Sequence, residues 1–137
     1  MNRISLMAVA VGNIVDIVLS SIAGFLAAIY VLKSSAASTN NMDAANQFVL
    51  ASGVFWFWST LLGSLGSVLS GYVAARMARH DDVLNGGLSS ILSVGATVYA
   101  LVRGGAAGHE ALYFVSLLLS PAVTAFGGYL SARHRAR

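Results

Sequence analysis

Residues 71–79 read GYVAARMAR, and residues 128–137, at the other end of the chain, read GYLSARHRAR. Both stretches close a long apolar run with a glycine, a tyrosine and then arginines. A helix ending that occurs twice within 137 residues indicates that a helical unit has been duplicated. The apolar runs that lead into the two endings indicate what kind of unit it is.

The composition is that of a protein that lies in lipid. Charged residues make up 9% of the chain and apolar residues 57%, whereas about a quarter of an average soluble domain is charged. Four apolar runs reach the ~20 residues that a helix needs to cross a ~30 Å hydrocarbon core; they cover residues 4–32, 48–75, 83–102 and 111–132. We expect four transmembrane helices, because lipid leaves the open edge of a strand without hydrogen-bond partners. A very apolar soluble helical bundle is the alternative.

Aligning the chain with itself supports the duplication. With a shift of 69, residues 16–32 match residues 85–101 at seven of 17 positions, and both copies contain LSSI. With a shift of 57, residues 55–76 match residues 112–133 at eight of 22 positions. The repeat halves are therefore expected at about residues 13–76 and 82–133 of a single transmembrane domain that covers residues 1–137.

Each half contains two of the four expected helices, and so forms one helical hairpin. The sequence therefore predicts an all-α membrane protein of four transmembrane helices, built from two tandem hairpins of the same orientation. Such parallel hairpins are related by a pseudo-twofold axis along the membrane normal, unlike the inverted repeats of many transporters.

The basic residues predict the orientation of the chain. Lys33 and Arg103 lie on one side of the four runs, and six arginines lie on the other side. Because lysine and arginine accumulate on the cytoplasmic side, we expect both termini in the cytoplasm, in a bacterial inner membrane. The first run is too long for the 7 to 15 apolar residues of a cleaved signal peptide. Since the basic residues lie at the ends of the runs, and not along one face, the net charge of +3 does not indicate a nucleic-acid partner.

Small or polar residues recur every fourth position in all four runs. The members are Asp16, Ser20, Gly24, Ala28; Ser59, Gly63, Ser67, Gly71; Asn85, Ser89, Ser93, Thr97; and Ser116, Ser120, Thr124, Gly128. Residues four apart share one face of a helix, and small residues there let neighbouring backbones approach closely in lipid. We expect these stripes to be the faces on which the helices contact one another. A polar path for a solute along the same faces is the alternative.

Asp16 is the one acidic residue inside an apolar run. An intramembrane carboxylate is costly and points to function, so Asp16, helped by Asn13, could bind a proton or a cation. The repeat favours a second interpretation, because it aligns Asp16 with Asn85 and Asn13 with Asp82 near the start of the third run. Asn and Asp are common at helix N-termini, and Asp16 would then lie at the membrane interface.

Catalytic chemistry is not indicated. The chain has no cysteine, and it contains no HExxH motif, no GxSxG motif and no phosphate-binding glycine loop. The sequence HDD at residues 80–82 resembles a metal site only in composition, and solvated charge is the simpler interpretation. We therefore expect no enzyme activity, no metal and no cofactor. Pro121 within the fourth run predicts a break or kink in that helix.

One passage resembles a motif of small uncharacterised bacterial membrane proteins of four helices. In that motif, a helix ending of the form Gly-aromatic-x-Ala-x-Arg is followed by a short charged turn and a helix that begins with His-Gly or Asn-Gly. The matching residues here are Gly71, Tyr72, Ala74, Arg76, Asn85 and Gly86. The resemblance covers about 25 residues and implies a four-helix membrane fold, but no known activity.

Three functions follow from these observations as hypotheses. The first is a non-enzymatic membrane protein that acts through helix association, as a homo-oligomer or as a small subunit of a membrane complex. The alternative is a small channel or transporter for ions or small solutes that uses Asp16 and a path lined by Ser and Thr. A pore former that lyses cells, suggested by the small size and the basic tail, is the third.

Overall fold

In the computed structural model, residues 4–34, 41–103, 108 and 110–137 are described, and they form helices joined by short connections. The helices are α1 (Leu6–Ser34), α2 (Met42–Ala51), α3 (Gly53–Ala78), α4 (Asp82–Leu88), α5 (Ile91–Val102) and α6 (Glu110–Arg135). None of these described residues lies in a strand. The prediction of an all-α chain is therefore confirmed.

Among the described residues, four helical segments are long and apolar enough to cross a membrane: Leu6–Ser34, Gly53–Ala78, Asp82–Val102 and Glu110–Arg135. They correspond to the four predicted runs, and they make the chain an integral membrane protein. The second run begins later than expected, because Ser52 separates α2 from α3 and its hydroxyl accepts a hydrogen bond from the Phe55 amide.

The third run, predicted as one helix, is divided at Ser89 and Ser90 into α4 and α5. At this break both serine hydroxyls turn back onto the backbone, with Ser89 Oγ 2.7 Å from the Gly86 carbonyl oxygen and Ser90 Oγ 2.9 Å from that of Gly87. The predicted break at Pro121 is wrong, because α6 runs through Pro121 as one helix; a kink at Pro121 stays a prediction.

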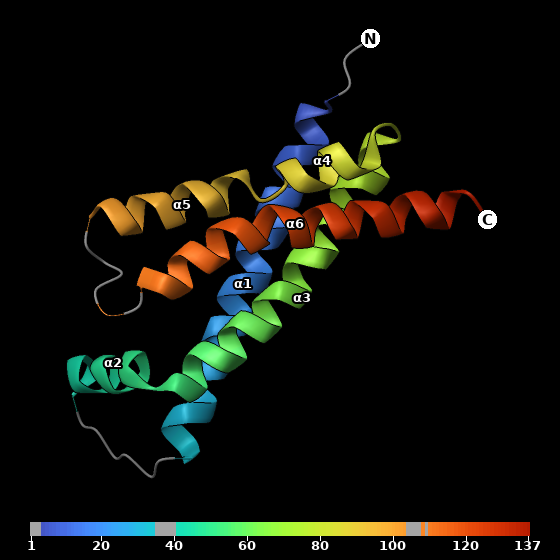
Figure 1. The fold of residues 1–137 in the computed structure, drawn as a ribbon. Coiled ribbons are helices and arrows are strands. Elements are labelled where there is room, and N and C mark those ends of the chain that lie inside the picture. The colour runs from blue at the N-terminus through green and yellow to red at the C-terminus, as the bar shows by residue number, and fades with distance from the viewer. Residues whose placement is uncertain (1–3, 35–40, 104–107, 109) are drawn as a thin grey trace.

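Figure 1 shows α1 and α3 side by side, with α6 crossing α3 and α5 running beside α6. The crossing of α3 and α6 depends on glycine. A Cβ atom added to Gly71 would overlap the Thr124 carbonyl oxygen, and one added to Gly127 would overlap the Val68 carbonyl oxygen. The two backbones therefore touch, as small-residue contacts in membranes allow.

A second close contact joins α4 to α6. A Cβ atom on Gly86 would lie 2.8 Å from the Cα atom of Gly128, and one on Gly128 would overlap the Asp82 carbonyl oxygen. At this end of the molecule, the predicted stripes are indeed helix contact faces.

Elsewhere the stripes are contact faces only in part: Asp16, Ser67 and Ser93 are hydrogen-bonded across helices, but the expectation that whole stripes are contact faces is wrong at Gly24 and Gly63. A Cβ atom on Gly24 or on Gly63 would meet nothing within 4 Å outside its own helix. None of the residues of α5 is buried. The helices are thus tightly packed where α4 and α6 cross α3, and they separate toward the far ends of α5 and α6 (Figure 1).

The interior of the molecule is polar. Its largest fully buried side chains are those of Asn85, Thr124, Asp16, Ser70, Ser89, Ser90 and Ser131. Large apolar side chains such as Leu6, Phe25 and Leu118 are 80%, 66% and 75% exposed. This distribution suits a protein whose surroundings are lipid, because apolar groups then need no burial and polar groups must find partners inside.

Candidate functional site: a polar cavity at Asp16

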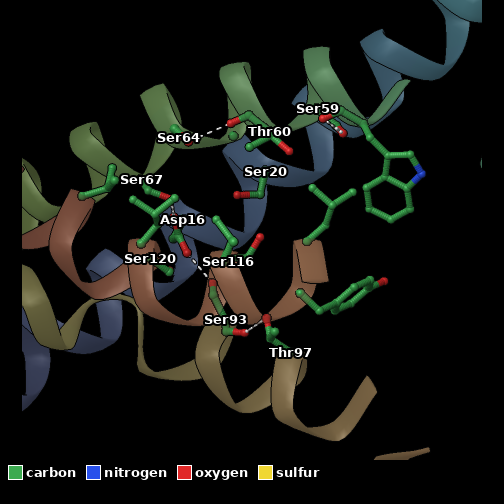
Figure 2. A pocket seen from close by; sticks show the side chains of 17 residues that line it. Asp16, Ser20, Ser59, Thr60, Ser64, Ser67, Ser93, Thr97, Ser116 and Ser120 are labelled. Atoms are coloured by element: carbon green, nitrogen blue, oxygen red, sulfur yellow. Dashed lines mark hydrogen bonds between the residues drawn. The ribbon is translucent and has the colours of Figure 1, made fainter. Parts of the chain in front are cut away.

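A cavity of about 310 Å³ lies where the helices separate. Four helices supply hydroxyl groups to its lining (Figure 2), and the labelled residues with a carboxylate or hydroxyl are Asp16, Ser20, Ser59, Thr60, Ser64, Ser67, Ser93, Thr97, Ser116 and Ser120. Most of these are members of the predicted stripes. The stripes therefore have two roles, since they are contacts at the crossing of α3 and α6 and a cavity wall beyond it.

Asp16 lies on α1 at the inner end of this wall and is 1% exposed. The Ser67 hydroxyl on α3 is 2.6 Å from Asp16 Oδ1, and the Ser93 hydroxyl on α5 is hydrogen-bonded to Asp16 Oδ2. Figure 2 shows the carboxylate between these two serines, with Ser116 and Ser120 of α6 beside it. One side chain thus links three helices at the cavity.

The depth of Asp16 follows from its partners. Ser67 is 14 residues from the first residue of α3 and 11 residues from the last, which places it ~21 Å and ~17 Å from the two ends of that helix. Ser93 is likewise near the middle of the segment Asp82–Val102. Asp16 is therefore level with the middle of two membrane-length segments.

The interpretation of Asp16 as a residue of a helix start is wrong. The first helix begins at Leu6, ten residues before Asp16, so no free amide of a first turn is available to the carboxylate. The buried position agrees with the other expectation, that of a carboxylate inside the membrane.

Asn13 was expected beside Asp16 in an ion or proton site. Instead, its side-chain amide is hydrogen-bonded to the backbone on both sides of the break in the third run. Its Oδ1 atom accepts a hydrogen bond from the Leu92 amide at 2.9 Å, and its Nδ2 atom donates to the Leu88 carbonyl oxygen at 3.3 Å. These are backbone groups that the break removes from the regular helical pattern. Asn13 therefore holds the ends of α4 and α5 and does not line the cavity.

Asn85, the third residue of the expected ion site, also lies away from the cavity. Its Oδ1 atom accepts from the Ser5 amide at 2.8 Å, and its Nδ2 atom donates to the carbonyl oxygens of His80 and Asp81 at 2.9 and 3.1 Å. The structure thus places Asp16 alone of the three in the cavity. Asn85 ties the start of α1 to the turn between α3 and α4.

Two aromatic side chains line the outer part of the cavity. Trp56 of α3 and Tyr113 of α6 are in edge-to-face contact, with ring centroids 6.0 Å apart and planes at 63°. The indole nitrogen of Trp56 donates to the Leu50 carbonyl oxygen at 2.9 Å, which fixes the ring against the end of α2. The sequence alone does not indicate this pairing, because it depends on how α3 and α6 cross.

The sequence HDD at residues 80–82 lies at the turn after α3 and at the start of α4. Asp82 is buried and pairs with Arg135, with Oδ1 and Nη2 3.2 Å apart, and Arg135 also donates to the Ala75 carbonyl oxygen. The expectation that these charges are all solvated is therefore wrong for Asp82. Within the described part of the chain, no group of three or more His, Cys, Asp or Glu could hold a metal ion.

No protein-family model, no curated protein and no solved structure matches the chain. The function must therefore be argued from the cavity and the residues around it.

Proposed function

We propose that the protein is a small, non-enzymatic membrane carrier in which Asp16 takes up and releases a proton while a small solute occupies the cavity. The observation that carries the proposal is the position of Asp16, 1% exposed between Ser67 and Ser93 at the end of a polar cavity. An ionisable group inside a membrane costs several kcal/mol and is kept where function requires it.

The two serine partners suit a carboxyl group that changes its protonation state. A hydroxyl can donate to an ionised carboxylate and can also accept from a protonated one. Ser67 and Ser93 could therefore hold Asp16 in both states, and no described lining residue of the cavity is a lysine or an arginine that would fix the carboxylate as an anion.

Proteoliposomes with a pH-sensitive dye inside test the proposal. Under an imposed pH gradient, the wild-type protein is expected to dissipate the gradient faster than empty liposomes. The proton flux through Asp16→Asn is expected to be at least tenfold lower than through the wild type. Asp43→Asn removes an exposed carboxylate from the first turn of α2 and serves as the matched control. Equal flux with Asp16 and with Asn at this position, or no flux from the wild type, would contradict the proposal.

A second proposal is association with another membrane protein or with a second copy of the chain. Ser20, Thr60 and Ser116 are exposed at the cavity, and hydroxyls that face acyl chains are unfavourable. Either water or another helix would cover them. Cross-linking in native membranes followed by mass measurement tests this, and a strictly monomeric protein would leave the carrier as the better proposal.

The orientation and the duplication belong to the same proposal. We propose that both termini face the cytoplasm of a bacterial inner membrane, as the arginines indicate, and that α1 with α3 and the segment Asp82–Val102 with α6 are the two duplicated hairpins. The glycine contacts near Gly71 and Gly128, which the shift of 57 aligns, would then lie at the cytoplasmic end.

A further inference from the structure

We infer that the solute of the cavity is a small organic cation, an amine or a quaternary ammonium compound. The inference rests on the proposed function in one respect, because it takes Asp16 to be the functional residue of the cavity. It adds the chemical class of the solute, which follows from the charge, the hydroxyls and the rings of the lining.

The charge of the lining selects the sign of the ligand. Asp16 is the one ionisable carboxylate among the described lining residues, and these include no lysine, arginine or histidine. A charge at the end of a cavity with walls of low dielectric constant acts over a longer range than it would in water. The cavity therefore attracts cations and repels anions.

Several hydroxyl groups of the walls act only as acceptors toward the cavity. Ser59 donates to the Phe55 carbonyl oxygen at 2.7 Å, Ser64 to that of Thr60 at 2.7 Å, and Thr97 to that of Ser93 at 2.8 Å. A hydroxyl whose proton is bonded to its own helix presents only oxygen lone pairs to the cavity. Such walls suit the N–H groups or the polarised C–H groups of an ammonium compound.

The aromatic pair favours an organic cation over a hydrated metal ion. Trp56 and Tyr113 both line the cavity, and the hydrogen bond from the Trp56 N–H group to the Leu50 carbonyl oxygen holds the indole ring in place. Aromatic faces attract ammonium groups through the negative charge of the ring face. Leu112, Val115 and Leu119 add apolar lining, and a cavity of about 310 Å³ lies within the range of small-molecule sites, roughly 300 to 1,000 Å³.

The test compares three probes of the same shape that differ in charge. They are choline, its neutral carbon isostere 3,3-dimethylbutan-1-ol, and the anion 3,3-dimethylbutanoate. The full chain is purified in nanodiscs as Trp58→Phe, which keeps a ring against Tyr30 and leaves Trp56 as the one tryptophan and as the reporter. We expect choline to change the Trp56 fluorescence saturably, and the neutral and anionic probes to bind at least tenfold more weakly.

Two variants connect the signal to the site. Asp16→Asn is expected to weaken choline binding at least tenfold, and Tyr113→Leu, which keeps an apolar side chain, about threefold to tenfold. Thermal unfolding of each variant shows whether it is folded. If Asp16→Asn does not fold, Tyr113→Leu still tests the inference. Leu118→Ala, at a position that is 75% exposed on the same helix as Tyr113, is the control that should leave binding unchanged.

The outcomes separate this inference from the proposed function. Binding of the neutral probe within threefold of choline, no binding of choline, or displacement of choline by equimolar sodium or potassium would overturn the organic cation. Proton flux that is lost in Asp16→Asn together with any of these results would leave the carrier standing with another solute. Choline binding without proton flux would instead contradict proton transport by Asp16 and would support the cation site.

Discussion

Glycines that look alike in the sequence have different surroundings in the fold. Gly24 and Gly71 both belong to stripes with four-residue spacing. The backbone of α6 lies against Gly71, whereas Gly24 has open space beside it. The spacing identifies a helix face, but it does not show whether another helix approaches that face closely.

Gly71→Ala is therefore expected to destabilise the protein, because its Cβ atom would overlap the Thr124 carbonyl oxygen. Overpacking of this kind costs ~1 to 3 kcal/mol. Gly24→Ala is the matched control, and it should be neutral or stabilising by up to ~1 kcal/mol, since alanine favours the helix. Unfolding in detergent with increasing SDS measures both changes, and equal stability of the two variants would contradict the close crossing of α3 and α6.

We predict opposite effects on stability for the substitution of two buried serines by alanine. Ser131 is 0% exposed and its hydroxyl has no hydrogen-bond partner in the described part of the chain, whereas the hydroxyl of Ser70, also 0% exposed, lies 2.8 Å from the Gly12 carbonyl oxygen. An unpaired buried hydroxyl costs ~1 to 3 kcal/mol. Ser131→Ala should therefore be neutral or stabilising, and Ser70→Ala should be destabilising by about 1 kcal/mol. The same SDS titration checks the order, and a larger loss at Ser131 would show that its hydroxyl has a partner.

At the scale of elements, one tetrapeptide adopts two structures. LSSI at residues 19–22 lies inside the continuous helix α1, whereas LSSI at residues 88–91 contains the break between α4 and α5. Two differences separate the copies. Asn85, Gly86 and Gly87 precede the second copy, and glycine lowers helix propensity by ~1 kcal/mol. In addition, the side chain of Asn13 reaches the second copy from α1.

Asn13→Ala is expected to loosen the break, because it leaves the Leu92 amide and the Leu88 carbonyl without the side-chain partner seen in the structure. Each unpaired buried group costs ~1 to 3 kcal/mol. Hydrogen exchange followed by mass spectrometry should show faster exchange at the start of α5, while α2, which Asn13 does not touch, should be unchanged. Unaltered exchange in α5 would mean that the break is held by other contacts.

The sequence was sufficient for the four membrane-length segments, but not for the break at Ser89 and Ser90 or for the site. The apolar runs predicted the four membrane-length segments, because crossing lipid requires both length and apolarity. Asp16 was identified as a candidate because a carboxylate is rare in such a run. The sequence left two positions open for Asp16, because its surroundings depend on Ser67 and Ser93, which lie 51 and 77 residues away in the chain. The pair Trp56 and Tyr113 likewise requires the crossing of α3 and α6.

At the scale of the whole molecule, the two ends differ. At one end the glycine contacts and the ion pair of Arg135 with Asp82 hold α3, α4 and α6 together. At the other end the helices separate around the cavity (Figure 1). At that end the contact of Trp56 with Tyr113 still joins α3 to α6, so the cavity has a packed end and an aromatic end.

The ion pair should therefore contribute to the stability of the packed end. The side chain of Asp82 is 8% exposed and that of Arg135 is 28% exposed. A double-mutant cycle with Asp82→Asn and Arg135→Gln is expected to give a coupling energy of ~0.5 to 3 kcal/mol in SDS unfolding. The cycle of Asp82→Asn with Arg133→Gln, an exposed arginine on the same helix, is the control. A coupling energy below ~0.3 kcal/mol between Asp82 and Arg135 would mean that the ion pair does not stabilise the fold more than water around the separate charges does.

The absence of cysteine allows the direction of the opening to be measured with single cysteines. If the termini are cytoplasmic, the cavity between the separated helices opens toward the outside, and water should reach Ser116 from there. A membrane-impermeant thiol reagent added to intact cells should then label Ser116→Cys, which lines the cavity, but not Leu118→Cys, which is exposed on the same helix and would face lipid. Arg137→Cys should react only after the membrane is permeabilised.

Labelling of Ser116→Cys only from the cytoplasm would reverse the orientation and leave the cavity intact. Equal labelling of Ser116→Cys and Leu118→Cys would instead show that the cavity is no wetter than the lipid-facing surface, and Asp16 would then lack the aqueous access that a proton carrier needs.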